Sequence, residues 1–336
     1  MQTQLRQAVV VAFGRTPYCK ARKGSFAQLH PVEYGAQTLL GVLARVPQLR
    51  PEDIGDVIMG CAMPFGVQGG NMARLIVQRA GLPDCVTAQT VNRYCSSGLQ
   101  TIATAANAIR CGEEDVVIAG GVESMSLVPM LVGAEDADPW LAEHRPEVYT
   151  TMGITAENVA RQWGISRADM DAMAVESHRR AAQAQAGGCF DGQIIPITVP
   201  GPDGGEVVVC RDEGIRPGTT AETLAGLKPC FLENGSVTAA TSSQMTDGAG
   251  FVVLMSEEKA AELGVKPLAR FVSFATGGVP AEVMGVGPIE AVPKALRKTG
   301  LTLEQMDTIE LNEAFASQAL AVIRTLGMDP ARVNPW

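Results

Sequence analysis

With 336 residues, the chain is longer than one hydrophobic core usually supports, so two or more packed units are expected. Its 46% hydrophobic and 19% charged residues are typical of a folded globular protein and exclude extensive disorder. A net charge of −9 argues against a nucleic-acid binder, because phosphate recognition depends on clustered lysine and arginine.

Cysteine spacing and the length of apolar runs exclude further classes of protein. The eight cysteines form no CxxC pair, which disfavours a structural metal site and a compact disulfide framework. The apolar run at residues 8–12 is too short for the core of a secretory signal, and no run has the length needed to span a bilayer. We therefore expect a cytoplasmic protein with reduced thiols, no bound metal and no membrane insertion.

Short runs rich in valine and isoleucine alternate with alanine-rich stretches of helical period, which is typical of an α/β protein with buried strands. In chain order, strands are predicted at residues 8–13, 56–59, 115–119, 250–255, 269–274 and 308–311. Helices are predicted at residues 35–46, 97–110, 154–162, 167–186 and 289–298.

One internal similarity bears on the architecture. Near the start, Pro-Val-Glu at 31–33 is followed by a helical run, Leu-Arg-Pro-Glu-Asp-Ile at 49–54 and a strand at 56–58. Pro-Ile-Glu at 288–290, a helical run, residues 301–306 and a strand at 308–310 repeat this order with nearly the same spacing. Two similar βαβαβ-type halves are the preferred interpretation. Chance similarity is the alternative, because helix–turn–strand connections are common.

The composition changes between these halves, where proline, glycine and charged residues become frequent. We interpret residues 121–244 as an inserted loop lobe, and such insertions often hold ligand contacts. The predicted domains are residues 1–120 with 245–265 returning to them, the lobe at 121–244, and a second half at 266–336.

Cys95 lies where a predicted extended segment ends and a helix of small residues begins. Unpaired backbone N–H groups and the positive end of the helix dipole favour a thiolate at such a position. Cys95 is therefore a candidate nucleophile. The alternative is that Cys95 is a small buried residue, as most cysteines are.

Five motifs then match one family in the family's own order. They are NRYCSSGLQ at 92–100, AGGVESMS at 119–126, MGITAENVA at 152–160, SVTAATSSQMTDGA at 236–249 and LNEAFA at 311–316. The chain resembles the thiolases, the acetyl-CoA acyltransferases that include 3-ketoacyl-CoA thiolase. This resemblance implies a thiolase fold with a layered α/β/α/β/α core, and a homodimer or tetramer.

The resemblance also implies a reaction and residue roles. Thiolases exchange acyl groups with coenzyme A through an acyl-cysteine, which divides one difficult carbon–carbon step into two easier ones. Coenzyme A would be a substrate rather than a tightly bound cofactor. By resemblance, Cys95 is the nucleophile and its N–H serves one oxyanion hole, while Asn312 fixes a water in another. The alternative for Asn312 is a turn-forming asparagine at a strand end.

A coenzyme A site needs a few cations and a narrow apolar path. By resemblance this path includes Met152, Arg216, Phe231, Ala239, Ser243 and Phe315, with Ser243 near the pantetheine amides. Arg216 could equally be a solvated loop charge, and Met152 or Phe315 could be core residues.

None of the three histidines lies in a Gly-His-Pro motif, where thiolases have the base that activates the nucleophile. His30 precedes Pro31 in a loop, His144 falls in a charged stretch, and His178 resembles a solvated helix position. The family's second cysteine, in a Cys-x-Gly motif, is also missing. Both motifs normally follow the position of Trp336, so the second half is expected to be incomplete and turnover by this chain to be poor.

The resemblance leaves three functional alternatives beside degradative 3-ketoacyl-CoA thiolysis. Residues 126–149 are more like the degradative enzymes of β-oxidation, and Thr151 stands where biosynthetic acetoacetyl-CoA thiolases have histidine. That biosynthetic type is the first alternative. A thiolase-fold protein that binds coenzyme A without catalysis is the second, because the base is missing. A ketosynthase-like condensing enzyme fits least, because the Asn-Glu-Ala-Phe and Gly-Gly-Val-Glu-Ser motifs are thiolase-like.

Overall fold

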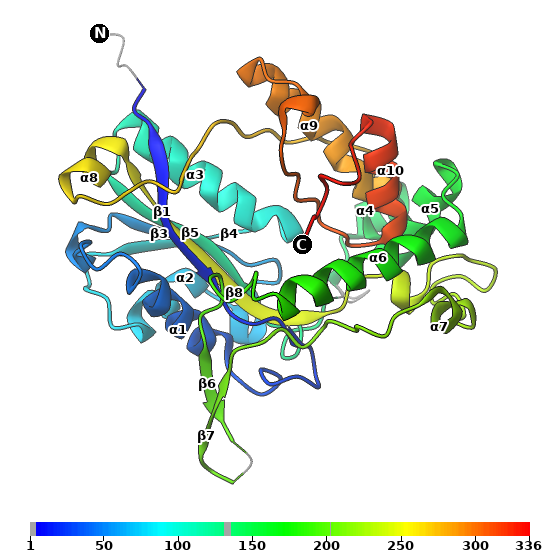
Figure 1. Cartoon of the computed structure of the whole chain (residues 1–336), viewed down its shortest axis with the longest axis horizontal. Helices are drawn as coiled ribbons and strands as arrows, with labels where there is room; N and C mark the ends of the chain where they lie inside the picture. The colour runs from blue at the N-terminus through cyan, green and yellow to red at the C-terminus, as the bar shows by residue number, and fades with distance from the viewer. Residues whose placement is uncertain (1–4, 131–135, 202) are drawn as a thin grey trace. The chain divides into compact units, whose positions relative to one another are not determined.

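The computed structural model describes residues 5–130, 136–201 and 203–336 (Figure 1). The chain forms two compact units. Unit 1 comprises residues 1–130, 190–214 and 245–272, and unit 2 comprises residues 131–189, 215–244 and 273–336. The lobe predicted at 121–244 is thus shared between both units, and its residues 131–135 and 202 lie outside the described part. Across the described residues, no helix is both long and apolar enough to cross a bilayer.

Unit 1 is built on one mixed sheet (Figure 1). Its strands are β1 (Ala8–Arg15), β2 (Cys19–Lys20), β3 (Asp56–Gly60), β4 (Thr87–Val91), β5 (Val116–Glu123), β8 (Thr246–Ser256) and β9 (Ala269–Arg270). The order is β4-β3-β5-β8-β1-β9, with β2 paired to β8. The pairs β4–β3 and β3–β5 are parallel, whereas β5–β8, β8–β1 and β1–β9 are antiparallel.

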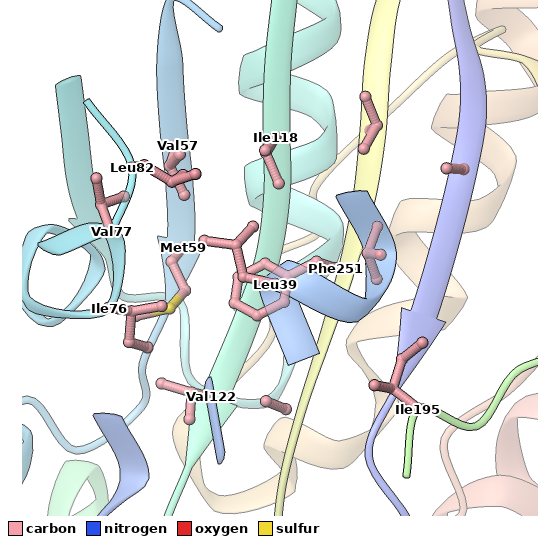
Figure 2. Packing of buried hydrophobic residues seen from close by; sticks show 14 of the residues in the cluster. Leu39, Val57, Met59, Ile76, Val77, Leu82, Ile118, Val122, Ile195 and Phe251 are labelled. Carbon is pink, nitrogen blue, oxygen red and sulfur yellow. The ribbon is translucent and has the colours of Figure 1, made fainter. Parts of the chain in front are cut away.

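Helices cover both faces of this sheet, and the strand sequences explain why. Val116, Ile118 and Val122 of β5 belong to one buried cluster, with residues of α1 (Pro31–Leu43) and α2 (Met72–Arg79). The alternate positions Val117 and Ala119 pack on the other face against α3 (Ser97–Cys111). Because successive side chains of a strand point to opposite faces, a strand buried on both sides is apolar throughout. Figure 2 shows the first cluster.

The remaining part of unit 1 is a hairpin and a short helix. Strands β6 (Ile197–Pro200) and β7 (Glu206–Val209) form an antiparallel two-stranded sheet, and α8 (Glu257–Glu262) follows β8. Arg15 of β1 fixes the chain beyond this hairpin through a bidentate pair with Asp212 (2.7 and 2.9 Å). Such a planar, doubly hydrogen-bonded pair holds its partners in one geometry.

Unit 2 is mainly helical within the described residues. Its helices are α4 (Pro139–His144), α5 (Met152–Gln162), α6 (Arg167–Ala186), α7 (Ala221–Ala225), α9 (Gly287–Thr299) and α10 (Ala316–Leu326). Helix α6 begins with a capping box in which Ser166 and Asp169 satisfy each other's backbone N–H groups. Buried residues of α5 and α10, including Ala156 and Ala316, share one apolar cluster.

Most predicted elements are confirmed, and two strands are not. The four strands predicted up to residue 255 and all five predicted helices are present, with end positions differing by a few residues. The strand predicted at 269–274 is reduced to β9, and the one at 308–311 is wrong. Ile309 makes a single parallel bridge to Val333, and in the described residues no longer ladder forms there. An apolar segment becomes a strand only where a neighbour offers consecutive hydrogen bonds.

Candidate active site

Cys95 lies in a tight turn between β4 and α3 in unit 1. The segment Tyr94–Ser96 forms one 3-10 turn, and α3 starts at Ser97. Tyr94 has φ = 46°, a left-handed conformation that is costly for a residue with a large side chain. The Cys95 side chain is exposed. The turn therefore leaves Cys95 accessible at the surface of unit 1, at the cost of local backbone strain.

Hydrogen bonds from neighbouring side chains hold this strained turn. The Tyr94 N–H donates to Asn92 Oδ1 (2.8 Å), and Asn92 Nδ2 donates to the Ala62 carbonyl (3.0 Å). Ser97 Oγ accepts from the Arg93 N–H (2.8 Å) and donates to the Tyr94 carbonyl (2.6 Å). Both serve backbone groups that the turn would otherwise leave without partners.

The end of β3 approaches the start of α3 closely. A Cβ atom on Gly60 would lie 2.5 Å from Cβ of Ser97, nearer than real side-chain atoms approach each other. Only glycine fits this position without moving the first turn of the helix. Gly60 therefore determines where α3, and with it Cys95, can lie.

The expected lowering of the Cys95 pKa is wrong for the isolated chain. Surrounding protein atoms raise the pKa of the Cys95 thiol, its own backbone N–H acts in the opposite direction, and the charge of Glu123 raises it further. Partial removal of water outweighs the helix terminus, because desolvation disfavours the charged thiolate.

Glu123, at the end of β5, was not predicted as a site residue. Its carboxylate accepts from the Ala62 N–H (2.7 Å) and from Gln68 Nε2 (2.7 Å). The motif Gly-Gly-Val-Glu-Ser marks this position in the sequence, but nothing in the motif reveals partners 55 and 61 residues away. The carboxylate connects the ends of β3 and β5 and places a negative charge near Cys95.

Unit 2 contains a cavity of about 410 Å³. It is lined by side chains of α6, by residues 239–244 and by residues 310–313. Four residues predicted for the reaction or for coenzyme A are in its wall, namely Arg216, Ala239, Ser243 and Asn312. Cys95 belongs to unit 1, so the nucleophile and this cavity are each described within their own unit.

Two loops of the cavity wall are paired to each other. Ser242 and Phe315 form a β-bridge, and the Ser243 N–H donates to the Ala314 carbonyl (2.9 Å). These backbone contacts place Ser243 beside the Asn-Glu-Ala-Phe motif. The sequence motifs predict both segments in one site, but the sequence alone does not reveal that the two segments touch.

The buried carboxylate of Glu157 on α5 anchors the first of these loops. It accepts from the N–H groups of Ser236 (2.9 and 3.0 Å) and Val237 (2.9 Å). A Cβ atom on Gly235 would lie 2.2 Å from its Oε1. Glu157 is 6% exposed, and a carboxylate so far from water requires such donors.

Three predicted coenzyme A residues do not line the cavity in the described structure. Phe231 and Phe315 pack edge to face, with ring centroids 6.0 Å apart. Met152 is half-buried at the first position of α5. The next residue, Gly153, leaves room for the Phe231 ring, since a Cβ there would lie 2.1 Å from a ring carbon.

The three histidines have different surroundings. His30 caps α1, with Nδ1 accepting from the Val32 N–H (3.2 Å), and His144 stacks on Trp140 with centroids 4.6 Å apart. His178, predicted as a solvated helix position, instead lines the unit 2 cavity and accepts from the Arg216 N–H (3.3 Å).

Comparison with protein families accounts for nearly the whole chain. The family model described as "Thiolase, N-terminal domain" matches residues 8–258, and that described as "Thiolase, C-terminal domain" matches residues 265–336. The chain belongs to the thiolase family. The family membership expected from the five motifs is thereby confirmed.

Individual thiolases are similar over almost all of this chain. The 3-ketoacyl-CoA thiolase of Bacillus subtilis is 51% identical, with 98% of this chain and 86% of that protein covered. The human peroxisomal 3-ketoacyl-CoA thiolase is 42% identical, with 99% and 80% covered. The crystal structure of Bacillus anthracis acetyl-CoA acetyltransferase superposes with a TM-score of 0.91 at 40% identity, covering 99% of this chain and 86% of that one. The predicted thiolase fold is confirmed.

Proposed function

We propose that this thiolase cleaves 3-ketoacyl-CoA with coenzyme A, giving acetyl-CoA and an acyl-CoA shortened by two carbons. The main support is the 51% identity to a 3-ketoacyl-CoA thiolase over 98% of the chain. The exposed Cys95 in its strained turn supplies a nucleophile of the required kind. The names of the Bacillus subtilis and human relatives, both 3-ketoacyl-CoA thiolases, favour a degradative role in fatty-acid β-oxidation over the biosynthetic alternative.

The proposed reaction is two acyl transfers. The Cys95 thiolate attacks the keto carbon of the substrate, the bond between the keto carbon and the α-carbon breaks, and its electron pair leaves with acetyl-CoA as an enolate that takes up a proton. The thiol of a second coenzyme A then gives up its proton and attacks the acyl-cysteine, the bond between the acyl carbon and the Cys95 sulfur breaks, and Cys95 leaves as a thiolate. The proton that this thiol loses balances the one that the enolate takes up. Negative charge develops on a carbonyl oxygen in each step, and Asn312 is proposed to stabilise one such oxygen through a held water.

Because the pKa of Cys95 is raised, this mechanism requires something that favours ionisation of the thiol. A thiol with a raised pKa is a weaker source of thiolate at neutral pH, so substrate binding or a base must favour its ionisation. A well-placed base contributes about 10²–10⁴-fold in rate. His178 is the histidine on the unit 2 cavity wall.

The unit 2 cavity is the proposed site for coenzyme A. Arg216 supplies a cation for the phosphates, and Ala239 and Ser243 supply a narrow wall for the pantetheine arm. Phe231, Phe315 and Met152 are proposed to form the apolar part of the path when the ligand is bound. We further propose a cytoplasmic homodimer, with a tetramer as the alternative.

Trapping the acyl-cysteine tests the function directly. The protein is incubated with 3-ketoacyl-CoA in the absence of free coenzyme A, and peptides are analysed by mass spectrometry. The acyl mass is expected on Cys95, absent from Cys95→Ser and retained in Cys111→Ser, a matched control at the other end of α3. An acyl group on another cysteine, or none, would contradict the proposal.

Chain-length dependence separates the alternatives. Thiolysis of acetoacetyl-CoA and of longer 3-ketoacyl-CoA is compared at saturating coenzyme A. Preference for the longer substrates supports the degradative role, whereas strict preference for the four-carbon substrate supports the biosynthetic type, the activity in the name of the Bacillus anthracis relative. Binding of coenzyme A without turnover of either substrate supports the non-catalytic alternative.

A further inference from the structure

Asn334 makes an unusual set of contacts next to the segment that contains Asn312. Its Oδ1 accepts from the Leu311 N–H (2.8 Å), and its Nδ2 donates to the Leu311 carbonyl (2.8 Å). One side-chain amide thus satisfies both backbone groups of residue 311, as a neighbouring strand would do. Leu311 immediately precedes Asn312, so this amide fixes the backbone from which the Asn312 side chain projects.

The same amide also reaches the residue on the other side of Asn312. Asn334 Nδ2 donates to Glu313 Oε1 (2.8 Å), while Glu313 Oε2 accepts from Ser177 Oγ of α6 (2.7 Å). Hydrogen bonds with Asn334 therefore fix the residues on both sides of Asn312. The carbonyl of Asn312 itself accepts from Gln318 Nε2 (3.2 Å).

Asn334 is held in turn by the backbone around it. It has φ = 46°, which asparagine and glycine tolerate better than other residues. Arg180 of α6 donates to the carbonyls of Val333 (2.7 Å) and Asn334 (3.1 Å), and the Asn334 N–H donates to the Ile309 carbonyl (2.9 Å). Segment 309–313 is thus positioned by side-chain amide and carboxylate contacts where a strand ladder is lacking.

We propose that Asn334 and Glu313 are positioning residues that hold Asn312 in its working orientation at the cavity wall. This rests on the oxyanion role proposed above for Asn312. An oxyanion-hole donor contributes only when it is held in place before the charge develops, and misplacement by about 1 Å can cost 10²-fold in rate. Asn334 and Glu313 do not themselves take part in bond making or breaking.

Asn334→Gly is the decisive substitution, because glycine keeps the left-handed backbone and removes the amide. We expect kcat for thiolysis to fall about 10–100-fold, with a smaller change in KM for coenzyme A, and never by more than in Asn312→Ala. If Asn334 serves only to allow a positive φ, Asn334→Gly will retain full activity, and the proposal is wrong.

A double-mutant cycle shows whether Asn334 acts through Asn312. Because Asn334 has nothing left to position once the carboxamide is gone, adding Asn334→Gly to Asn312→Ala should change kcat less than twofold. Two losses that multiply would mean that Asn334 acts independently of Asn312, which contradicts the proposal. Thermal unfolding of each variant identifies any loss that reflects unfolding.

Exchanging donor and acceptor tests the Asn334–Glu313 pair. Asn334→Asp places a second carboxylate beside Glu313 and should lower kcat at least as much as Asn334→Gly. Glu313→Gln alone should lower kcat less than Asn334→Asp does, because the Ser177 hydroxyl and the Asn334 amide can both adapt to a neutral amide. Combining both changes restores one donor and one acceptor, so kcat should recover partly. Failure of the combined variant to exceed Asn334→Asp contradicts the pairing.

One measurement is independent of activity. Amide hydrogen exchange of the peptide containing Leu311 should be about 10-fold faster in Asn334→Gly than in the unsubstituted protein, because the Leu311 N–H loses its acceptor. An unchanged exchange rate at Leu311 would contradict the proposal that Asn334 positions segment 311–313. Absence of thiolysis in the unsubstituted protein would instead contradict the proposed function, and the exchange result would still decide the positioning role.

Discussion

The two units of this thiolase order their functional segments by different means. In unit 1, Cys95 follows β4, the edge strand of a sheet in which the pairs β4–β3, β3–β5 and β5–β8 each span five or more residues and whose faces are buried under helices. In unit 2, the segments of Ser243 and Asn312 make isolated bridges and are held mainly by Glu157, Glu313 and Asn334. Packing supports the Cys95 segment of unit 1, and buried polar side chains support the functional segments of unit 2.

This difference predicts different sensitivities to substitution. Removing a large apolar side chain from unit 1 should cost overall stability, since the loss spreads through a shared core. Removing one polar side chain from unit 2 should disturb a particular loop more than the fold.

The largest effect is expected for Phe251→Ala in unit 1. Phe251 is 2% exposed on β8 and packs in the cluster shown in Figure 2. The free energy of unfolding should fall by about 3–5 kcal/mol, from lost burial and from the cavity left behind. Urea unfolding monitored by circular dichroism gives the value. A loss below about 1 kcal/mol would mean that the sheet of unit 1 does not depend on this core.

Glu157→Ala is the matched change in unit 2. It leaves the N–H groups of Ser236 and Val237 without their acceptor, which costs about 1–3 kcal/mol. Because the loop beyond them contains Ala239 and Ser243, coenzyme A affinity should fall at least 10-fold in calorimetry. Glu233→Ala, at an exposed position of the same unit, is the control. Equal coenzyme A affinity in the two variants would show that Glu157 does not hold the coenzyme A site in place.

Acid should weaken unit 2 through Glu176 of α6. Hydrogen bonds from Arg179 and Arg180 lower the pKa of Glu176 from 4.5 to about 2. A carboxyl with a lowered pKa contributes stability above its unfolded value, and this contribution is lost as the pH falls through about 2. Its side chain is 42% exposed, so solvent screening limits the contribution to about 0.2–1 kcal/mol.

Glu176→Gln should therefore flatten the loss of stability between pH 4.5 and 2. The measurement is Tm at several pH values, with Glu233→Gln as the control for removing one charge. A steeper acid loss in Glu176→Gln than in the unsubstituted protein would reverse the predicted sign.

The smallest expected effect concerns the reactivity of Cys95 in the unsubstituted protein and involves no change in stability. Because the pKa of its thiol is raised, the rate of alkylation by iodoacetamide should keep increasing above pH 8.5, about the usual value for a free thiol. Peptide mapping at each pH follows Cys95 separately from Cys111. A rate that is already constant at pH 8 would show a lowered pKa and favour the helix-terminus argument.

The contrast between the units also explains which features could be predicted from sequence. The buried strands β1, β3, β5 and β8 and the facing helices α1 and α3 have strong apolar periodicity, so they were predicted, whereas the facing helix α2 was not. Strand β4 (TAQTV) was absent from the predicted strands, and the segment before Cys95 was predicted only as extended, because its edge position leaves polar side chains in alternation, without an apolar run. Residues 308–311 were wrongly predicted as a strand, because a sequence pattern does not reveal whether a partner is available.

The candidate site was predictable where the residues themselves do the chemistry. Cys95 and Asn312 lie in sequence motifs from which their chemical roles can be predicted. Glu157 accepts hydrogen bonds from backbone groups 79 and 80 residues away, and Asn334 contacts a backbone group 23 residues away. Only the fold brings each side chain to its partners. The pKa of Cys95 was expected to fall because the helix terminus is visible in the sequence, whereas the surrounding protein atoms are not.

Gly60 has a consequence for interpreting inherited or selected variants of this enzyme. Its lack of a side chain determines the spacing between β3 and the first turn of α3. A random-mutagenesis screen for inactive clones should therefore recover Gly60 alongside Cys95, although Gly60 offers no functional group to a substrate. Ranking variants by side-chain chemistry alone would class Gly60→Ala as mild, and the distance to Ser97 indicates the opposite.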